Sequence, residues 1–242
     1  MEKEVVLEAL SALLGVPVKS GSKGASNVDE LSIWNLLSTL LFGRLTTDLV
    51  LGGLGEGLRD ELFVDMDEFF DPKYDYDFTR CNDKSTCMRG NEAYKRPCGW
   101  NRIAVKVLDK YPDGNVWLGT DGWRSHSVAG EWPVSYHGTS IEGAKSIVTS
   151  HYKAGPRDLY GRGIYSTYDI DQASGYSKEF TSKTNGKTYR VLMQNRINPQ
   201  MRKVCKRTDY WLIEIPEGTS PEKEREIVEN SIRPYGILLK QV

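Results

Sequence analysis

KTYRVLMQNRI, residues 187–197, is the longest of several strand-like runs that follow residue 100. β-Branched, aromatic and aliphatic residues dominate these runs, and turn pairs such as Asn185-Gly186 separate them. Helices are expected at about 141–150 and 169–180, and Ser220-Pro221 opens a third over EKEREIVEN. The pattern predicts an α+β fold with a mostly antiparallel sheet. The other strand-like runs are NRIAVKVL (101–108), NVWLG (115–119), EWPVSYHG (131–138), GRGIYST (161–167), DYWLIEI (209–215) and PYGILLK (234–240).

The first 63 residues differ in composition and hydrophobic pattern, and they are predicted to form an acidic helical N-terminal region. Apolar residues recur at helical spacing over 5–14, and the Gly/Ser-rich stretch 18–27 then predicts a linker or mobile loop. A second helix is expected over 29–43, where Asp29 supplies the cap. Because the sequence becomes acidic and aromatic from residue 64, we place a domain boundary there and treat 64–242 as the second region.

Charge is distributed unevenly along the 242 residues, although the net charge is only -1. Residues 1–77 hold 15 acidic and 6 basic side chains, a net -9, whereas residues 78–242 hold 26 basic and 18 acidic side chains, a net +8. This split suggests that the acidic part, including DMDEFFD at 65–71, docks on a basic surface and restrains it. Two independently solvated surfaces are the alternative interpretation.

The composition, 39% hydrophobic and 27% charged, excludes a collagenous or wholly disordered chain. No apolar run reaches the ~18 residues of a membrane span, so no membrane partner is expected. The start of the chain, MEKEVVLEALSALLG, is acidic where a secretory signal is basic. We therefore expect an intracellular location, cytoplasmic or nuclear.

The four cysteines are too few and too irregularly spaced for the disulfide framework of a small secreted protein, so reduced thiols are expected. Cys81, Cys87 and Cys98 offer zinc ligands together with His126, but the paired short spacings of a structural zinc site are missing. Loop thiols are the preferred interpretation, and no metal is expected.

Three short segments at the ends of predicted strands carry the chemistry. They are Tyr136-His137-Gly138-Thr139, then Gly161-Arg162-Gly163-Ile164-Tyr165-Ser166-Thr167, then Asp209-Tyr210-Trp211-Leu212. Each is ordinary alone, because a histidine at a strand end and a Gly-x-Gly turn are common. In this order, over residues 131–242, they resemble the ADP-ribosyltransferases of the diphtheria-toxin and poly(ADP-ribose) polymerase type, which carry a His-Tyr-Glu triad.

The resemblance implies a fold and a set of site residues. The fold is a split antiparallel sheet with flanking helices, here preceded by the helical N-terminal region. By resemblance, His137 bonds a ribose hydroxyl of NAD+, backbone groups of Gly138 hold the nicotinamide amide, and Tyr165 stacks on the nicotinamide ring. Tyr176 matches a second stacking tyrosine, although the family often has serine where this chain has Ala173. The two arginines near the glycine turn are expected to contact the pyrophosphate or adenosine side of NAD+; the alternative is that they are solvent-exposed loop cations. The remaining residues expected to bind the cofactor are Thr139, Arg157, Arg162, Gly163 and Ser166.

A carboxylate is expected at the third position of the triad, because loss of nicotinamide leaves a positively charged, oxocarbenium-like ribose. Where the family typically has glutamate, this chain has Asp209, which is one methylene shorter. Glu214 is five residues further on the predicted strand, on the opposite face from Asp209, and is therefore predicted to be a poor substitute.

The resemblance thus implies an NAD+-dependent ADP-ribosyltransferase that releases nicotinamide. Transfer of a single ADP-ribose unit to a protein or nucleic acid is the preferred form of the reaction. A catalytically inactive NAD+- or ADP-ribose-binding module is the first alternative. An RNA 2'-phosphotransferase-like enzyme is the second, but the Gly-Arg-Gly-Ile-Tyr segment lacks the His and Arg set of that chemistry. Basic clusters at 80–107 and 187–207 would contact a polyanionic acceptor or form a solvated face.

Overall fold

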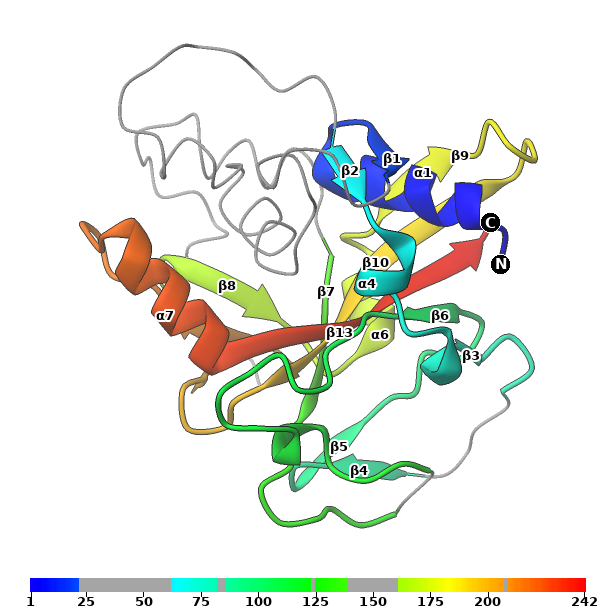
Figure 1. The fold of residues 1–242 in the computed structure, drawn as a ribbon. Coiled ribbons are helices and arrows are strands. Elements are labelled where there is room, and N and C mark those ends of the chain that lie inside the picture. The colour runs from blue at the N-terminus through cyan, green and yellow to red at the C-terminus, as the bar shows by residue number, and fades with distance from the viewer. Residues whose placement is uncertain (22–61, 82–85, 123–124, 139–160, 207–208) are drawn as a thin grey trace.

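The computed structural model describes residues 1–21, 62–81, 86–122, 125–138, 161–206 and 209–242 (Figure 1). The helices predicted at 29–43 and 141–150 lie outside the described residues. Within them the fold is α+β with mostly antiparallel sheets, as the sequence predicts at this coarse level. No helix among the residues described is long and apolar enough to cross a membrane.

The main sheet is antiparallel and is built around its two longest strands, β10 (Thr188–Ile197) and β13 (Ile232–Gln241), which cross the middle of the molecule in Figure 1. β10 is buried along nearly its whole length, including its polar residues Gln194, Asn195 and Arg196. The order across the sheet is β3 (Tyr76–Asp77), β6 (Asn101–Ala104), β13, β10 and β7 (Val134–His137), and β9 (Lys178–Thr181) also pairs with β10.

Three smaller sheets accompany it. The sheet that matters for the site consists of β11 (Lys203–Val204), β12 (Trp211–Glu214) and β8 (Gly163–Ser166), all antiparallel. The other two are the hairpin β4–β5 (Cys87–Arg89 and Glu92–Tyr94) and the parallel pair β1–β2 (Val18–Ser20 and Leu62–Val64).

Helix α1 (Lys3–Leu14) covers the main sheet near β9 and β10 (Figure 1). Its buried residues, Leu10 among them, join Val191 and Leu239 of the sheet in one apolar cluster. A carboxylate oxygen of Glu8 also accepts hydrogen bonds from the backbone of the β9–β10 turn, at 3.0 Å from the Lys183 nitrogen. Residues 3–20 therefore share a core with the second region, although composition separates the two.

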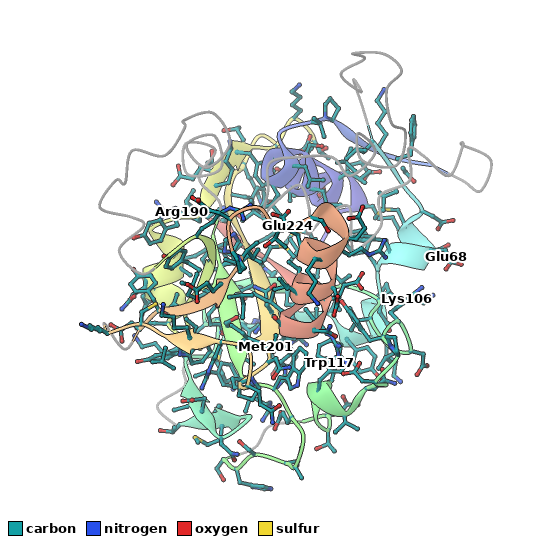
Figure 2. All side chains as sticks on the ribbon, turned by 90° about the vertical axis from the view of Figure 1, so that its left-hand side faces the viewer. Glu68, Lys106, Trp117, Arg190, Met201 and Glu224 are labelled. Carbon is teal, nitrogen blue, oxygen red and sulfur yellow. The ribbon has the colours of Figure 1, made fainter. Side chains whose placement is uncertain are left out.

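The acidic segment DMDEFFD is built into this core. Asp65 caps α4 (Met66–Phe69) by accepting from two backbone nitrogens, and Phe69 and Phe70 are buried in the α1 cluster. Lys106, labelled beside this helix in Figure 2, donates to the Asp67 carbonyl at 3.0 Å. The burial of Phe69 and Phe70 makes DMDEFFD part of the core. The hypothesis that the acidic part restrains a basic surface stays a prediction.

Local structure departs from the sequence prediction at three places. Residues 18–20, predicted as linker, form β1 by pairing with β2. The predicted strand 115–119 contains the 3-10 helix η2 (Val116–Leu118). The predicted helix 169–180 is only α6 (Ile170–Ser174), followed by β9, where Phe180 stacks on Tyr189 of β10. The first helix and the helix after Ser220-Pro221, α7 (Pro221–Ser231), are confirmed, and a second 3-10 helix, η1, spans Pro72–Tyr74.

Two further apolar clusters complete the core. One lies between the β8–β12 sheet and α7, where Ile164, Ile213 and Val228 meet. The other lies on a face of the main sheet and includes Trp100 and Tyr136. His137 and Tyr165, two of the predicted site residues, lie where the main sheet and the β8–β12 sheet approach each other.

Candidate functional site

Strand β7 of the main sheet meets strand β8 of the smaller sheet at one backbone bridge. The Tyr136 nitrogen donates to the Thr167 carbonyl at 2.7 Å, and the Thr167 nitrogen donates to the Tyr136 carbonyl at 3.1 Å. This bridge places the next residue, His137, beside β8, and its Nδ1 lies 2.7 Å from the Tyr165 carbonyl oxygen. The structure therefore brings together His137 and Tyr165, two members of the predicted triad.

The contact with Tyr165 fixes the protonation of the His137 ring. A carbonyl oxygen only accepts, so Nδ1 carries the hydrogen. Burial lowers the pKa of His137, and the hydrogen bond to the Tyr165 carbonyl opposes this only in part. The ring is therefore neutral, and its Nε2 is a buried acceptor without a partner among the described residues. A buried acceptor of this kind suits a ligand hydroxyl group.

Gly138 lies against the end of helix α6. A Cβ at this position would lie 2.7 Å from the Tyr176 carbonyl oxygen and 2.9 Å from the Ala173 carbonyl oxygen, so only glycine fits. Tyr176 is 43% exposed, and its hydroxyl lies 3.5 Å from that of Tyr210. The Tyr176 ring is thus accessible to a ligand near the end of β7.

Strands β8 and β12 are in register, with Tyr165 opposite Leu212 and Gly163 opposite Glu214. Gly163 is required by close approach, because a Cβ there would lie 1.9 Å from the Ile213 carbonyl oxygen. The Tyr165 hydroxyl donates to the Gly161 carbonyl at 2.6 Å, which ties the ring to the glycine turn.

Ser166 belongs to the other face of this strand pair. It lies opposite Trp211, and it is only 2% exposed. Trp211 belongs to the cluster that packs on α7. Ser166 therefore lies toward the interior, and its hydroxyl is a second buried polar group without a partner in the described part of the chain.

The carboxylates near the site are arranged differently from the expectation. Asp209 precedes β12 and accepts a hydrogen bond from the Tyr168 hydroxyl at 3.1 Å; this bond raises the pKa of Tyr168. Since directly opposed and alternate residues share a face, Tyr165, Leu212 and Glu214 lie on one face of the β8–β12 pair. The acidic residue on the face of Tyr165 is therefore Glu214, which sequence reasoning set aside. Only the β8–β12 register, which local sequence does not reveal, could have identified it.

Arg162 holds the end of β12 and the start of α7 together. It donates to the carbonyls of Ile215 and Pro216 at 3.2 and 2.9 Å, and to Glu224 of α7, labelled in Figure 2, at 2.7 Å. These hydrogen bonds give the Arg162 guanidinium a structural role between β12 and α7. Its contact with a pyrophosphate stays a prediction. Thr139 and Arg157 lie outside the described residues.

Many side chains of the two basic clusters are paired with acidic residues of other strands, helices or loops. Arg196 is only 5% exposed, so it does not contribute to a solvated basic face. Acidic partners from other segments therefore reduce the charge available to a polyanion. The pairs are Arg89–Glu131, Lys95–Asp169, Lys95–Asp171, Arg190–Glu179, Arg196–Glu131, Arg202–Glu92 and Lys203–Glu214.

The four cysteines are free thiols, with Cys87 and Cys205 buried. Across the described ranges, no group of three or more His, Cys, Asp or Glu side chains could hold a metal ion.

Comparison with known proteins adds no family assignment. Neither a scan of protein-family models nor a search of curated proteins gives a match for this chain.

Proposed function

We propose that this protein is an NAD+-dependent ADP-ribosyltransferase that transfers one ADP-ribose unit to a protein or nucleic acid. One observation carries the proposal: His137 is held by the Tyr165 carbonyl through Nδ1 and leaves Nε2 as a buried, unpartnered acceptor. Nε2 would accept a hydrogen bond from a ribose hydroxyl of NAD+. This supports the interpretation drawn from the order of the sequence motifs.

The nicotinamide end of NAD+ would lie against the Tyr165 ring and the exposed Tyr176 ring. A flat pyridinium cation is attracted to the faces of aromatic rings. Gly138 supports the same placement, since the lack of a Cβ leaves its backbone close to the Tyr176 segment. The proposed fold at this site is the split antiparallel sheet of the family named above.

In the proposed reaction the glycosidic bond between the nicotinamide nitrogen and ribose C1' breaks. Its electron pair leaves with nicotinamide, which departs as a neutral molecule, and positive charge develops on the ribose. An oxygen or nitrogen of the acceptor then forms the new bond to C1' and loses its proton. A carboxylate near the ribose stabilises the developing charge, and Asp209 and Glu214 are the two candidates for this role.

The experiment that tests the proposal incubates the full chain with labelled NAD+ and a mixture of cell protein, RNA and DNA. Nicotinamide release and covalent attachment of label are expected, and protease or nuclease sensitivity of the label identifies the acceptor class. His137→Ala is expected to abolish both signals while the variant stays folded. Release that is unaffected by His137→Ala contradicts the proposal.

Parallel Asp209→Asn and Glu214→Gln variants identify the carboxylate. If Glu214 on the face of Tyr165 is the group that acts, Glu214→Gln lowers the rate by about a hundredfold and Asp209→Asn has a much smaller effect. The reverse result assigns the role to Asp209.

A second candidate function is binding without turnover. The hydrogen bond from Tyr168 to Asp209 favours it, because that shorter carboxylate is already engaged within the protein. In that case wild-type protein binds NAD+ or ADP-ribose, His137→Ala weakens this binding, and no nicotinamide is released.

A further inference from the structure

A separate cavity of about 290 Å³ lies on the other face of the main sheet from His137. Four arginines line it: Arg89, Arg96, Arg102 and Arg196. The Arg102 stem crosses Gly236, where a Cβ would lie 2.8 Å from Arg102 Cδ, and Gly236 is aligned across the sheet with Gln194 and Tyr136. Because side chains alternate along β7, His137 projects to the opposite face from Tyr136. The cavity and the His137 site are therefore distinct.

A β-bulge directs an aromatic ring into this cavity. Gln194 pairs with Gly236 and Asn195 pairs with Pro234, which leaves Tyr235 as the extra residue of β13. Bulges of this kind re-aim side chains and are enriched next to functional sites. The Tyr235 ring centroid lies 5.7 Å from Arg102 Cζ and 5.4 Å from Arg196 Cζ, so this ring is near two guanidinium groups.

Arg196 is fixed by a buried acid but is incompletely satisfied. The Glu131 side chain, which is fully buried, lies 3.1 Å from Arg196 Nη1 and 3.4 Å from Arg89 Nε. Arg196 also donates to the carbonyls of Trp132 and Leu118, both at 2.6 Å. Its Nε is buried without a partner among the described residues. One donor of a rigidly held guanidinium is thus left for a ligand.

Arg102, on strand β6, which is separated from β10 by β13, also has an unpaired donor. Its Nη2 donates to the Tyr74 carbonyl at 2.8 Å, whereas its Nε is a second buried donor for which the described chain supplies no acceptor. Leaving buried charged donors unpaired is costly, and an anionic oxygen that reached either Nε would satisfy it. Planar guanidinium groups of this kind match the geometry of a phosphate group.

The remaining walls suit a planar ring that carries hydrogen-bond donors. Arg96 lies over the rings of Tyr76 and Phe78, 5.9 and 5.3 Å from their centroids, and both rings line the cavity. Two acidic residues, Asp71 and Asp121, line it as well. A carboxylate repels phosphate but accepts from the exocyclic amino group of a base. The walls therefore offer both an anion-binding part and an amino-accepting part.

We propose that this cavity, which we call the Arg–Tyr pocket, binds a nucleoside monophosphate whose base carries an amino group. The phosphate would accept from the Nε groups of Arg102 and Arg196, and the base would lie against the aromatic rings. The volume is near the lower limit of ~300 Å³ for ligand pockets, which suits one nucleotide better than a dinucleotide such as NAD+. The proposal does not depend on the transferase activity.

The test titrates full-length protein with AMP by calorimetry. Saturable binding is expected, weakened at least about tenfold by Arg102→Gln, since a charged hydrogen bond is lost. Arg96→Gln provides a second variant at another wall. The matched control is Arg190→Gln, which alters an exposed arginine paired with Glu179 and is expected to leave AMP affinity unchanged. His137→Ala is expected to leave it unchanged too.

Competition experiments show whether the amino group of the base is recognised, and whether the bound nucleotide is free or is the end of a nucleic-acid strand. UMP, which lacks an amino group, is expected to bind about fivefold more weakly than AMP. Displacement of AMP by a 5'-phosphorylated oligonucleotide identifies the end of a nucleic-acid strand as the source, and failure to displace it identifies the free nucleotide. Three results would overturn the proposal: no saturable AMP binding, equal binding of inorganic phosphate or phosphotyrosine, or AMP binding lost in His137→Ala but kept in folded Arg102→Gln and Arg96→Gln.

Discussion

Replacing Gly163 with alanine tests whether the close approach of β8 and β12 organises the candidate site. The added Cβ would lie 1.9 Å from the Ile213 carbonyl oxygen. An ordinary C···O contact is about 3.3 Å, so the strands must separate by about 1.4 Å. That movement disrupts the adjoining hydrogen bond from Ile215 nitrogen to Arg162 carbonyl, now 3.0 Å, and the Gly163–Glu214 pairing. Overpacking together with lost ladder bonds costs about 2–6 kcal/mol.

Urea unfolding of Gly163→Ala measures this cost, and Gly186→Ala is the matched control. Gly186 has a φ of 73° and Gly163 a φ of 155°, so both substitutions strain the backbone. No atom lies within 4 Å of a Cβ at Gly186, so its variant carries only a strain of about 1–2 kcal/mol. The free energy of unfolding should therefore fall clearly further for Gly163→Ala. Equal losses in the two variants would refute the close-approach argument.

Three further predictions concern other parts of the molecule. Leu10→Ala should lower the free energy of unfolding by about 2–5 kcal/mol in urea titrations, because Leu10 is fully buried on the face of α1 that packs on the main sheet. An unchanged value would show that α1 is not part of the cooperative core. Arg162→Gln should cost about 1–3 kcal/mol by the same measurement, and Arg225→Gln, which breaks a surface pair within α7, should cost less than about 0.5. Because folding lowers the pKa of His137 below its ordinary value of 6.5, the histidine of the unfolded chain takes up a proton at a higher pH than that of the folded chain. The free energy of unfolding therefore falls as the pH falls below 6.5, by at most about 1.4 kcal/mol per pH unit. His137→Gln should have a shallower stability profile between pH 7.5 and 5, and an identical slope would contradict the buried, neutral ring.

Local signals in the sequence were sufficient where one segment determines its own structure. Ser220-Pro221 predicts the start of α7, and the Ser220 side chain caps that helix as expected. The strand-like run 187–197 predicts β10. The sequence predicts helix over 178–180, but these residues form part of β9 because they pair with β10, which is a contact with another segment.

The candidate site was predictable only in part for the same reason. The order of the motifs predicts that His137 and Tyr165 belong to one site, and the two residues do contact each other. The placement of Glu214 on the face of Tyr165 depends on strand register, which no single segment contains. The Arg–Tyr pocket draws its walls from segments as distant as Asp71 and Tyr235, and its only sequence signal is the mixture of aromatic and basic residues over 74–102.

The rate of nicotinamide release from NAD+ tests the central claim most directly. Wild-type protein should release nicotinamide, folded His137→Ala should release none, and His126→Ala, which alters an exposed histidine, should match the wild type. Equal release by the His137→Ala variant, or none by wild-type protein at saturating NAD+ with all acceptor classes present, would contradict the transferase account.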